Sequence, residues 1–151
     1  MWYLPDGKLF ANTNTIRSFN YEVVEIQTIE KIKILKVLII DDEIDICYLL
    51  SGILKQKKLK TSYVNSLSDA EVALRNDPPS LIFLDNHLPD GFGLDFIQYI
   101  KNNYPSTKII MTTAHDSAAE RNRAYNEGAD IFISKPFTRD LINSSVDKLI
   151  S

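Results

Sequence analysis

Several residue types and patterns that would point to particular classes of protein are scarce or missing in this 151-residue chain. Its single cysteine, Cys47, cannot form an internal disulfide, which fits a reducing cytoplasm. Positive charge is not in excess: 17 basic and 20 acidic side chains argue against a surface that neutralises nucleic-acid phosphates. No apolar run approaches the roughly 18 residues of a membrane span, and the start lacks the basic and apolar regions of a secretory signal. We therefore expect a cytoplasmic protein that neither crosses a membrane nor binds DNA directly.

From Lys36 onward, short apolar runs alternate with segments of helical periodicity, which is the pattern of a parallel sheet with crossover helices. The five predicted strands cover residues 36–40, 61–64, 80–84, 108–112 and 130–134. All but the second are apolar enough to be buried on both faces. The second, more polar run is predicted to be an edge strand. The alternation predicts a doubly wound α/β domain with helices on both faces of the sheet.

Helical periodicity predicts a helix after each strand. The apolar stripes are Ile44, Leu49, Leu50, Ile53 and Leu54; Ala70, Ala73 and Leu74; Phe92, Leu94, Phe96, Ile97 and Ile100; and Leu141, Ile142, Val146 and Leu149. Either Ser66 or Ser68 could cap the second helix. Ser117 begins a capping box for the fourth helix, which is predicted to end near Gly128. Thr138 is predicted to cap the last helix.

Residues 1–35 lack the alternation of apolar runs and helical segments. Turn-forming residues fill their first half, and their basic and acidic charges balance. The segment 21–35 fits both a helix and a β-strand, since apolar residues recur at intervals of three but many are β-branched. We expect a partly disordered N-terminal extension over 1–35 and the folded domain over 36–151. The extension could be a non-essential tail, the product of a misassigned start codon, or a docking segment.

Polar residues follow four of the predicted strands. They are Asp41 and Asp42 after the first, Asp85 after the third, Thr112 and Thr113 at the end of the fourth, and Lys135 after the fifth. In an open parallel sheet, ligands bind outside the carboxyl ends of the strands, so these side chains should share one rim. Taken singly, each acid could be a helix cap and the lysine a solvated surface residue. A helix has one N-cap residue, so capping can account for Asp41 or Asp42 but not for both.

Carboxylates that meet at one rim repel one another unless a cation lies among them. Oxygen ligands without cysteine indicate a hard ion such as Mg²⁺, or Mn²⁺ in its place. A lysine ammonium and a threonine hydroxyl can each donate to phosphoryl or carboxylate oxygens. An aspartate can itself accept a phosphoryl group as an aspartyl phosphate.

Four motifs in order, VLIIDDE, IFLDNHLPDGFG, MTTA and GADIFISKPF, make the chain resemble the receiver domain of two-component response regulators over about residues 35–151. The resemblance implies a flavodoxin-like fold with strand order 2-1-3-4-5. It also implies a signalling role, not an enzyme that turns over a substrate. Because few residues follow Lys135, a stand-alone receiver is expected.

The resemblance also implies a role for each rim residue. Asp85 is the phosphoacceptor and Lys135 the lysine that contacts the phosphoryl group. The switch pair is Thr113 and Phe132, and the bond before Pro136 is often cis in the family. The implied metal ligands are Asp41, Asp42, Asp85 and the backbone carbonyl of His87. Asp42 is the favoured direct ligand of the acidic pair.

The implied partners are a sensor histidine kinase or a histidine phosphotransfer protein, with a downstream partner on the face formed by residues 117–150. A monomer and a phosphorylation-dependent dimer are both compatible with the sequence. Two rival interpretations are a receiver-like interaction module that works without phosphorylation and a phosphatase-type hydrolase. His87 stands where such a hydrolase carries an acid, two residues after Asp85, which weakens the second rival.

Two histidines, His87 and His115, each lie two residues after a site residue. In the resembled family these positions border the path of the water that hydrolyses the aspartyl phosphate. The imidazoles are therefore candidates for setting the dephosphorylation rate or its pH dependence. The alternative, that both are ordinary loop residues, carries equal weight.

Overall fold

The computed structural model describes residues 35–150, so all but the last residue of the predicted extension over 1–35 lies outside the described residues. The helices are α2 (Ile44–Gln56), α3 (Leu67–Asn76), α4 (Gly93–Asn103), α5 (Ala118–Glu127) and α6 (Arg139–Ile150). The strands are β1 (Lys36–Ile40), β2 (Lys60–Val64), β3 (Leu81–Asp85), β4 (His87–Leu88), β5 (Gly91–Phe92), β6 (Lys108–Thr113) and β7 (Ile131–Ser134). In the described part of the chain, no helix is long and apolar enough to cross a membrane.

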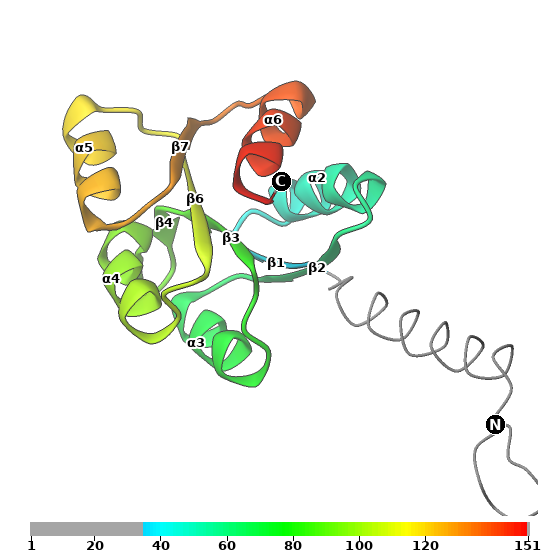
Figure 1. Ribbon diagram of the computed structural model, residues 1–151. Helices are drawn as coiled ribbons and strands as arrows, with labels where there is room; N and C mark the ends of the chain where they lie inside the picture. Colours follow the sequence, from blue (N-terminus) through cyan, green and yellow to red (C-terminus); the bar gives the residue numbers. More distant parts are fainter. Residues whose placement is uncertain (1–34, 151) are drawn as a thin grey trace, which may run out of the picture. The chain divides into compact units, whose positions relative to one another are not determined.

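The main sheet has five parallel strands in the order β2-β1-β3-β6-β7, and the helices lie on both of its faces (Figure 1). Counted along the chain, this is the predicted order 2-1-3-4-5. The doubly wound fold is therefore confirmed, and the second predicted strand is an edge strand as expected. Strand boundaries differ from the predicted ones by at most one residue at either end.

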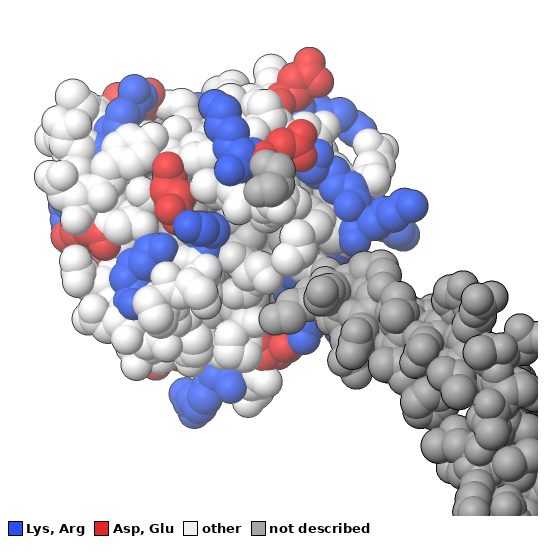
Figure 2. Space-filling model, viewed as in Figure 1, with Lys and Arg blue, Asp and Glu red and all other residues white. Residues whose placement is uncertain are grey.

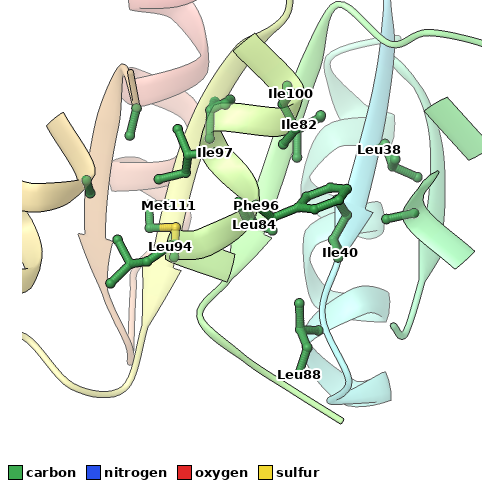
Figure 3. Close-up of a cluster of buried hydrophobic side chains, with 14 of the residues drawn as sticks. Leu38, Ile40, Ile82, Leu84, Leu88, Leu94, Phe96, Ile97, Ile100 and Met111 are labelled. Carbon is green, nitrogen blue, oxygen red and sulfur yellow. The ribbon is translucent and has the colours of Figure 1, made fainter. Parts of the chain in front are cut away.

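Alternating side chains of the central strands supply two separate cores, one on each face of the sheet. Leu38 and Ile40 of β1 point to the face covered by α3, α4 and α5, where Figure 3 shows them with the side chains of β3, α4 and β6. Val37 and Ile39 point to the opposite face, which α2 and α6 cover. Cys47 is fully buried in this second core, as predicted for a small apolar side chain.

The structure confirms the capping residues that the sequence predicts at the ends of three helices. The Ser66 hydroxyl accepts the backbone N–H of Asp69 at 3.1 Å, which decides between the two candidate caps of α3. Ser117 caps α5, and Gly128 closes that helix with a left-handed φ of 118°. The Thr138 hydroxyl accepts the N–H of Leu141 at the start of α6.

Five details of the predicted burial are wrong. The fifth strand was expected to be dry on both faces, but only Ile133 of β7 is buried, because β7 forms the second edge of the sheet. Four side chains that were placed on apolar helical stripes are exposed instead: Ile44 (41%), Leu49 (47%), Phe92 (52%) and Leu141 (44%). Ile44 lies at the first residue of α2 and Phe92 precedes α4, so neither is carried onto the core-facing stripe.

Charges of both signs are interspersed over the face of the described domain seen in Figure 2. A surface that neutralises a phosphate backbone gathers basic side chains in one stripe or patch. This face therefore offers no support for nucleic-acid binding.

Candidate functional site

The parallel register brings the ends of four strands to one rim of the sheet. Asp85, the last residue of β3, lies opposite Thr112, and Thr113 lies opposite Ser134. Asp41 directly follows β1, whose last residue pairs with Leu84. Lys135 directly follows β7. Residues separated by up to 94 positions in the chain are thereby brought into contact, as the sequence predicted.

Lys135 lies at the centre of this rim. Its ammonium donates to Asp41 Oδ2 at 2.9 Å, to Glu43 Oε1 at 2.9 Å and to Asp85 Oδ1 at 3.1 Å. The backbone N–H of Lys135 also donates to the Thr113 carbonyl at 2.7 Å. The Lys135–Pro136 peptide bond is cis, as the family resemblance implied. The lysine is thus held at both its backbone and its side chain.

Burial and charge shift the ionisation of these groups. Desolvation, followed by the charge of Asp41, raises the pKa of Asp85 from 3.8 to about 6, although Lys135 opposes the shift. Desolvation likewise raises the pKa of Asp41. Burial lowers the pKa of Lys135, but its bonds to Asp41 and Glu43 outweigh this effect and raise that pKa. Lys135 therefore stays protonated, and Asp85 is mostly ionised at neutral pH.

Three carboxylates at the rim lie close enough together to hold one cation. Asp41, Asp42 and Asp85 each offer an oxygen, and these atoms lie within 4.8 Å of one another. Asp41 and Asp85 are buried, whereas Asp42 is exposed and so open to solvent. An all-oxygen donor set with room for water fits Mg²⁺ or Mn²⁺. These three side chains are the ones that would hold the ion, and the ligation by the His87 carbonyl stays a prediction.

The predicted switch residues lie beside this rim. Thr113 is buried, and its hydroxyl accepts the backbone N–H of His115 at 3.1 Å. Phe132 is half-buried in β7 and packs against the core that faces α4 and α5. The guanidinium of Arg121 lies 5.5 Å from the centre of the Phe132 ring, at cation–π distance.

The two histidines, which the sequence placed near the site, contact each other. The rings of His87 and His115 are 5.0 Å apart between centroids, and Phe92 packs edge-on against His87 at 5.6 Å. The loops that follow β3 and β6 therefore meet through these two imidazoles.

The sequence interpretation missed two features of the segment after Asp85, where it expected a loop that leads into the helix beginning near Phe92. This stretch forms a short antiparallel hairpin of β4 and β5. The buried side chain of Asn86 accepts the N–H of Leu94, and its carbonyl accepts the N–H of Gly93. A Cβ at position 93 would lie 2.1 Å from the Asp85 carbonyl oxygen, so glycine is required there.

Glu43 is the other missed residue. It follows the two aspartates directly in the chain, and the structure adds its carboxylate to the partners of Lys135. The signal was available as a third consecutive acid at the same rim. A glutamate at the start of a predicted helix, however, has an ordinary explanation as a favourable charge near the helix N-terminus.

Comparison with known proteins agrees with this geometry. A family model described as "Response regulator receiver domain" matches residues 37–147. The response regulator protein PilR of Pseudomonas aeruginosa is 41% identical over 101 residues, covering 67% of this chain and 23% of that protein. The phosphate regulon transcriptional regulatory protein PhoB of Escherichia coli is 31% identical, with coverage of 68% and 46% respectively. The chain thus spans less than half the length of these relatives.

Solved structures show the same likeness. The beryllofluoride-activated NtrC4 receiver domain dimer superimposes with a TM-score of 0.73 at 32% identity, covering 76% of this chain and 94% of that one. The signal receiver domain of a LuxO repressor protein from Vibrio parahaemolyticus gives a TM-score of 0.72 at 30% identity, with coverage of 76% and 88%. Sequence family, strand order and the acidic rim agree, and the chain belongs to the family of response regulator receiver domains of two-component systems.

Proposed function

We propose that this receiver domain accepts a phosphoryl group on Asp85 from a phosphohistidine of a histidine kinase or a histidine phosphotransfer protein. The observation that carries the proposal is the position of the Asp85 carboxylate. It is buried at the end of β3, is bound on Oδ1 by Lys135, and lies within 4.8 Å of oxygens of two further aspartates. The proposal includes a cytoplasmic location and a signalling role without turnover of a substrate. A buried, unpaired Cys47 is in keeping with that location.

The transfer follows from the chemistry of the rim. An ionised oxygen of Asp85 attacks phosphorus, and the bond from phosphorus to the donor imidazole breaks with its electron pair retained on nitrogen. Lys135 donates to a phosphoryl oxygen and offsets the added negative charge. When bound by the three aspartates, Mg²⁺ supplies further neutralisation of the phosphoryl oxygens.

The switch belongs to the same proposal. A phosphoryl oxygen on Asp85 offers the Thr113 hydroxyl a new acceptor, and movement of Thr113 leaves space beside β7 for Phe132. Because Phe132 packs under Arg121 of α5, its movement changes the face formed by residues 117–150, where a downstream partner would bind. The charge added at Asp85 would in this way shift the face formed by residues 117–150 from one conformation towards another.

The test is covalent labelling of the full chain with acetyl phosphate in the presence of Mg²⁺, followed by intact mass spectrometry. We expect a mass gain of one phosphoryl group that is absent in Asp85→Asn and absent after chelation of Mg²⁺. Asp45→Asn, which removes an acid from the first turn of α2, serves as the matched control and should be labelled normally. An unlabelled wild type would favour an interaction module that works without phosphate. Repeated turnover of phosphate esters would indicate a hydrolase instead.

The histidine contact extends the proposal to the lifetime of the phosphate. His87 and His115 touch each other next to Asp85 and Thr113, so they are placed to hinder an approaching water molecule. Replacing both with alanine should accelerate dephosphorylation of the labelled protein, measured as loss of the mass adduct with time. An unchanged decay rate at equal thermal stability would show that the two rings are ordinary loop side chains.

A further inference from the structure

Lys135 has no free N–H donor for a phosphoryl group in this structure. A lysine ammonium carries three N–H bonds. All three are directed at carboxylates: Asp41 and Glu43 at 2.9 Å and Asp85 at 3.1 Å. If Asp85 is phosphorylated, one of these bonds must be exchanged for a bond to a phosphoryl oxygen.

We propose that Glu43 is a competing acceptor for Lys135, which holds the ammonium while Asp85 is unmodified and releases it to the phosphoryl group. The inference rests on the proposed phosphorylation of Asp85. It assigns to Glu43 a positioning role that limits the rate of labelling, and it places this residue outside the group that contacts the reacting atoms.

Burial identifies which of the three bonds is released. The side chains of Asp41 and Asp85 are 2% and 5% exposed, whereas that of Glu43 is 59% exposed. Leaving a buried carboxylate without its partner has a large desolvation cost, but an exposed carboxylate regains water when it lets go. The Glu43–Lys135 bond is therefore the least costly of the three to break.

The backbone at Glu43 allows this release without a change of fold. Glu43 precedes the first turn of α2 in an extended conformation, and its own side chain makes no capping bond. Its backbone N–H donates to Asp41 Oδ1 at 2.9 Å, so Asp41 holds the residue while the side chain stays free to rotate. The side chain can turn to solvent while the Asp41–Lys135 contact stays intact.

Charge favours the same exchange. A phosphoryl group adds negative charge to Asp85, beside the carboxylate of Glu43. Repulsion between the two then drives Glu43 away, while Lys135 gains a stronger acceptor. Before phosphorylation, the contact with Glu43 occupies one N–H of the Lys135 ammonium, which the transfer requires for a bond to the phosphoryl group.

The experiment compares initial rates of labelling by acetyl phosphate at saturating Mg²⁺ for the full-length wild type, Glu43→Gln and Glu43→Ala. We expect the alanine variant to be labelled roughly two- to fivefold faster than wild type, in proportion to the modest strength of an exposed ion pair. The glutamine variant should fall between them, because its amide oxygen still accepts a hydrogen bond but carries no charge. Asp45→Asn removes a neighbouring acid in the first turn of α2 that is not among the side-chain partners of Lys135 in the described residues, and it should match wild type.

Salt supplies a readout that a purely structural role would not change. At about 1 M salt, where the screening length is about 3 Å, the ratio between Glu43→Ala and wild type should shrink towards one. Equal acceleration by Asp45→Asn would mean that net charge alone controls the rate and would overturn the inference. Slower labelling of Glu43→Ala, with unchanged thermal unfolding, would overturn it as well, by showing that Glu43 helps Lys135 to act.

The two levels of the proposal fail in different ways. A wild type that takes no label contradicts phosphorylation of Asp85 itself. A wild type that is labelled at the same rate as both Glu43 variants leaves the proposed function intact and removes only the competing role of Glu43.

Discussion

Asp85 ends a strand in which every residue is buried, and its carboxylate is desolvated beside a second buried acid. Such an arrangement costs stability, because water would solvate the ionised group better than this rim does. Lys135 offsets part of that cost through its bond to Asp85. Burial of the ionised Asp85 carboxylate at this rim therefore lowers the stability of the folded state.

The raised pKa leads to a prediction for Asp85→Asn. Because the pKa rises from 3.8 to about 6 on folding, the native state binds the proton more tightly than the unfolded chain between these values. The stability of wild type consequently falls as the pH rises through this window. Without divalent cations at pH 7, Asp85→Asn should be more stable than wild type by about 1–3 kcal/mol, measured by urea unfolding.

Two controls accompany that measurement. The advantage of Asp85→Asn should disappear below about pH 4, where the wild-type carboxylate is protonated in both states. Adding Mg²⁺ at pH 7 should narrow the difference, since the cation stabilises only a native site that binds it. A variant less stable than wild type at pH 7 would show that the Lys135 contact outweighs the desolvation of Asp85.

Individual residues differed in how far the sequence alone could reveal them. The contact between Asp85 and Lys135 was predictable because strand ends in a parallel sheet converge, while their roles in phosphoryl transfer stay predictions. Glu43 was not, because an acid at a helix start is common and only the side-chain rotamer brings it to the lysine. The hydrophobic pattern of a sequence predicts which strand end a residue follows, but it does not predict the direction of a long, exposed side chain.

At the scale of elements, α3 begins close to the loop that follows Asp85. The Ser66 hydroxyl caps one N–H of the helix, and Asp90 accepts two more, those of Leu67 and Ser68, at 2.9 Å each. These bonds lower the pKa of Asp90. The hairpin of β4 and β5 is thereby tied to the N-terminus of α3.

The cap can be tested with two neighbouring serines. Ser66→Ala removes the bond to the Asp69 N–H and should lower the free energy of unfolding by about 1 kcal/mol. Ser68→Ala is the matched control, because the Ser66 hydroxyl accepts a backbone N–H of the helix and the Ser68 hydroxyl, 3.2 Å away from it, does not. The Ser68 substitution should therefore cost much less stability. Urea unfolding of both variants measures the difference. Equal losses would contradict the assignment of Ser66 as the cap.

The hairpin itself escaped prediction because each of its strands has two residues, too few for a period of two to be visible. Its turn chemistry was visible in Pro89 and Gly91, and the structure gives Gly91 a φ of 154°. Longer elements left a clear pattern, which is why α2 was found even though its first residue, Ile44, faces solvent. Short pairings are determined by tertiary contacts and not by local periodicity.

For the whole domain, strand order followed from the family resemblance, while burial depended on position in the sheet. β1, β3 and β6 have neighbours on both sides, and their apolar runs are dry as predicted. β7 has an equally apolar sequence but a neighbour on one side only. Composition alone cannot distinguish an apolar edge strand from a central one.

The residues of the rim are also synthesised in a fixed order, because they follow different strands of the sheet. Asp41 follows β1 and Asp85 ends β3, two paired strands that come early in the sequence, but Lys135 follows the last strand of the sheet. A chain still emerging from a ribosome can therefore pair β1 with β3 before it possesses the ammonium that binds Asp85. If Asp85 accepts a phosphoryl group as proposed, competence for that reaction would arise only when β7 joins the sheet, because Lys135 follows β7.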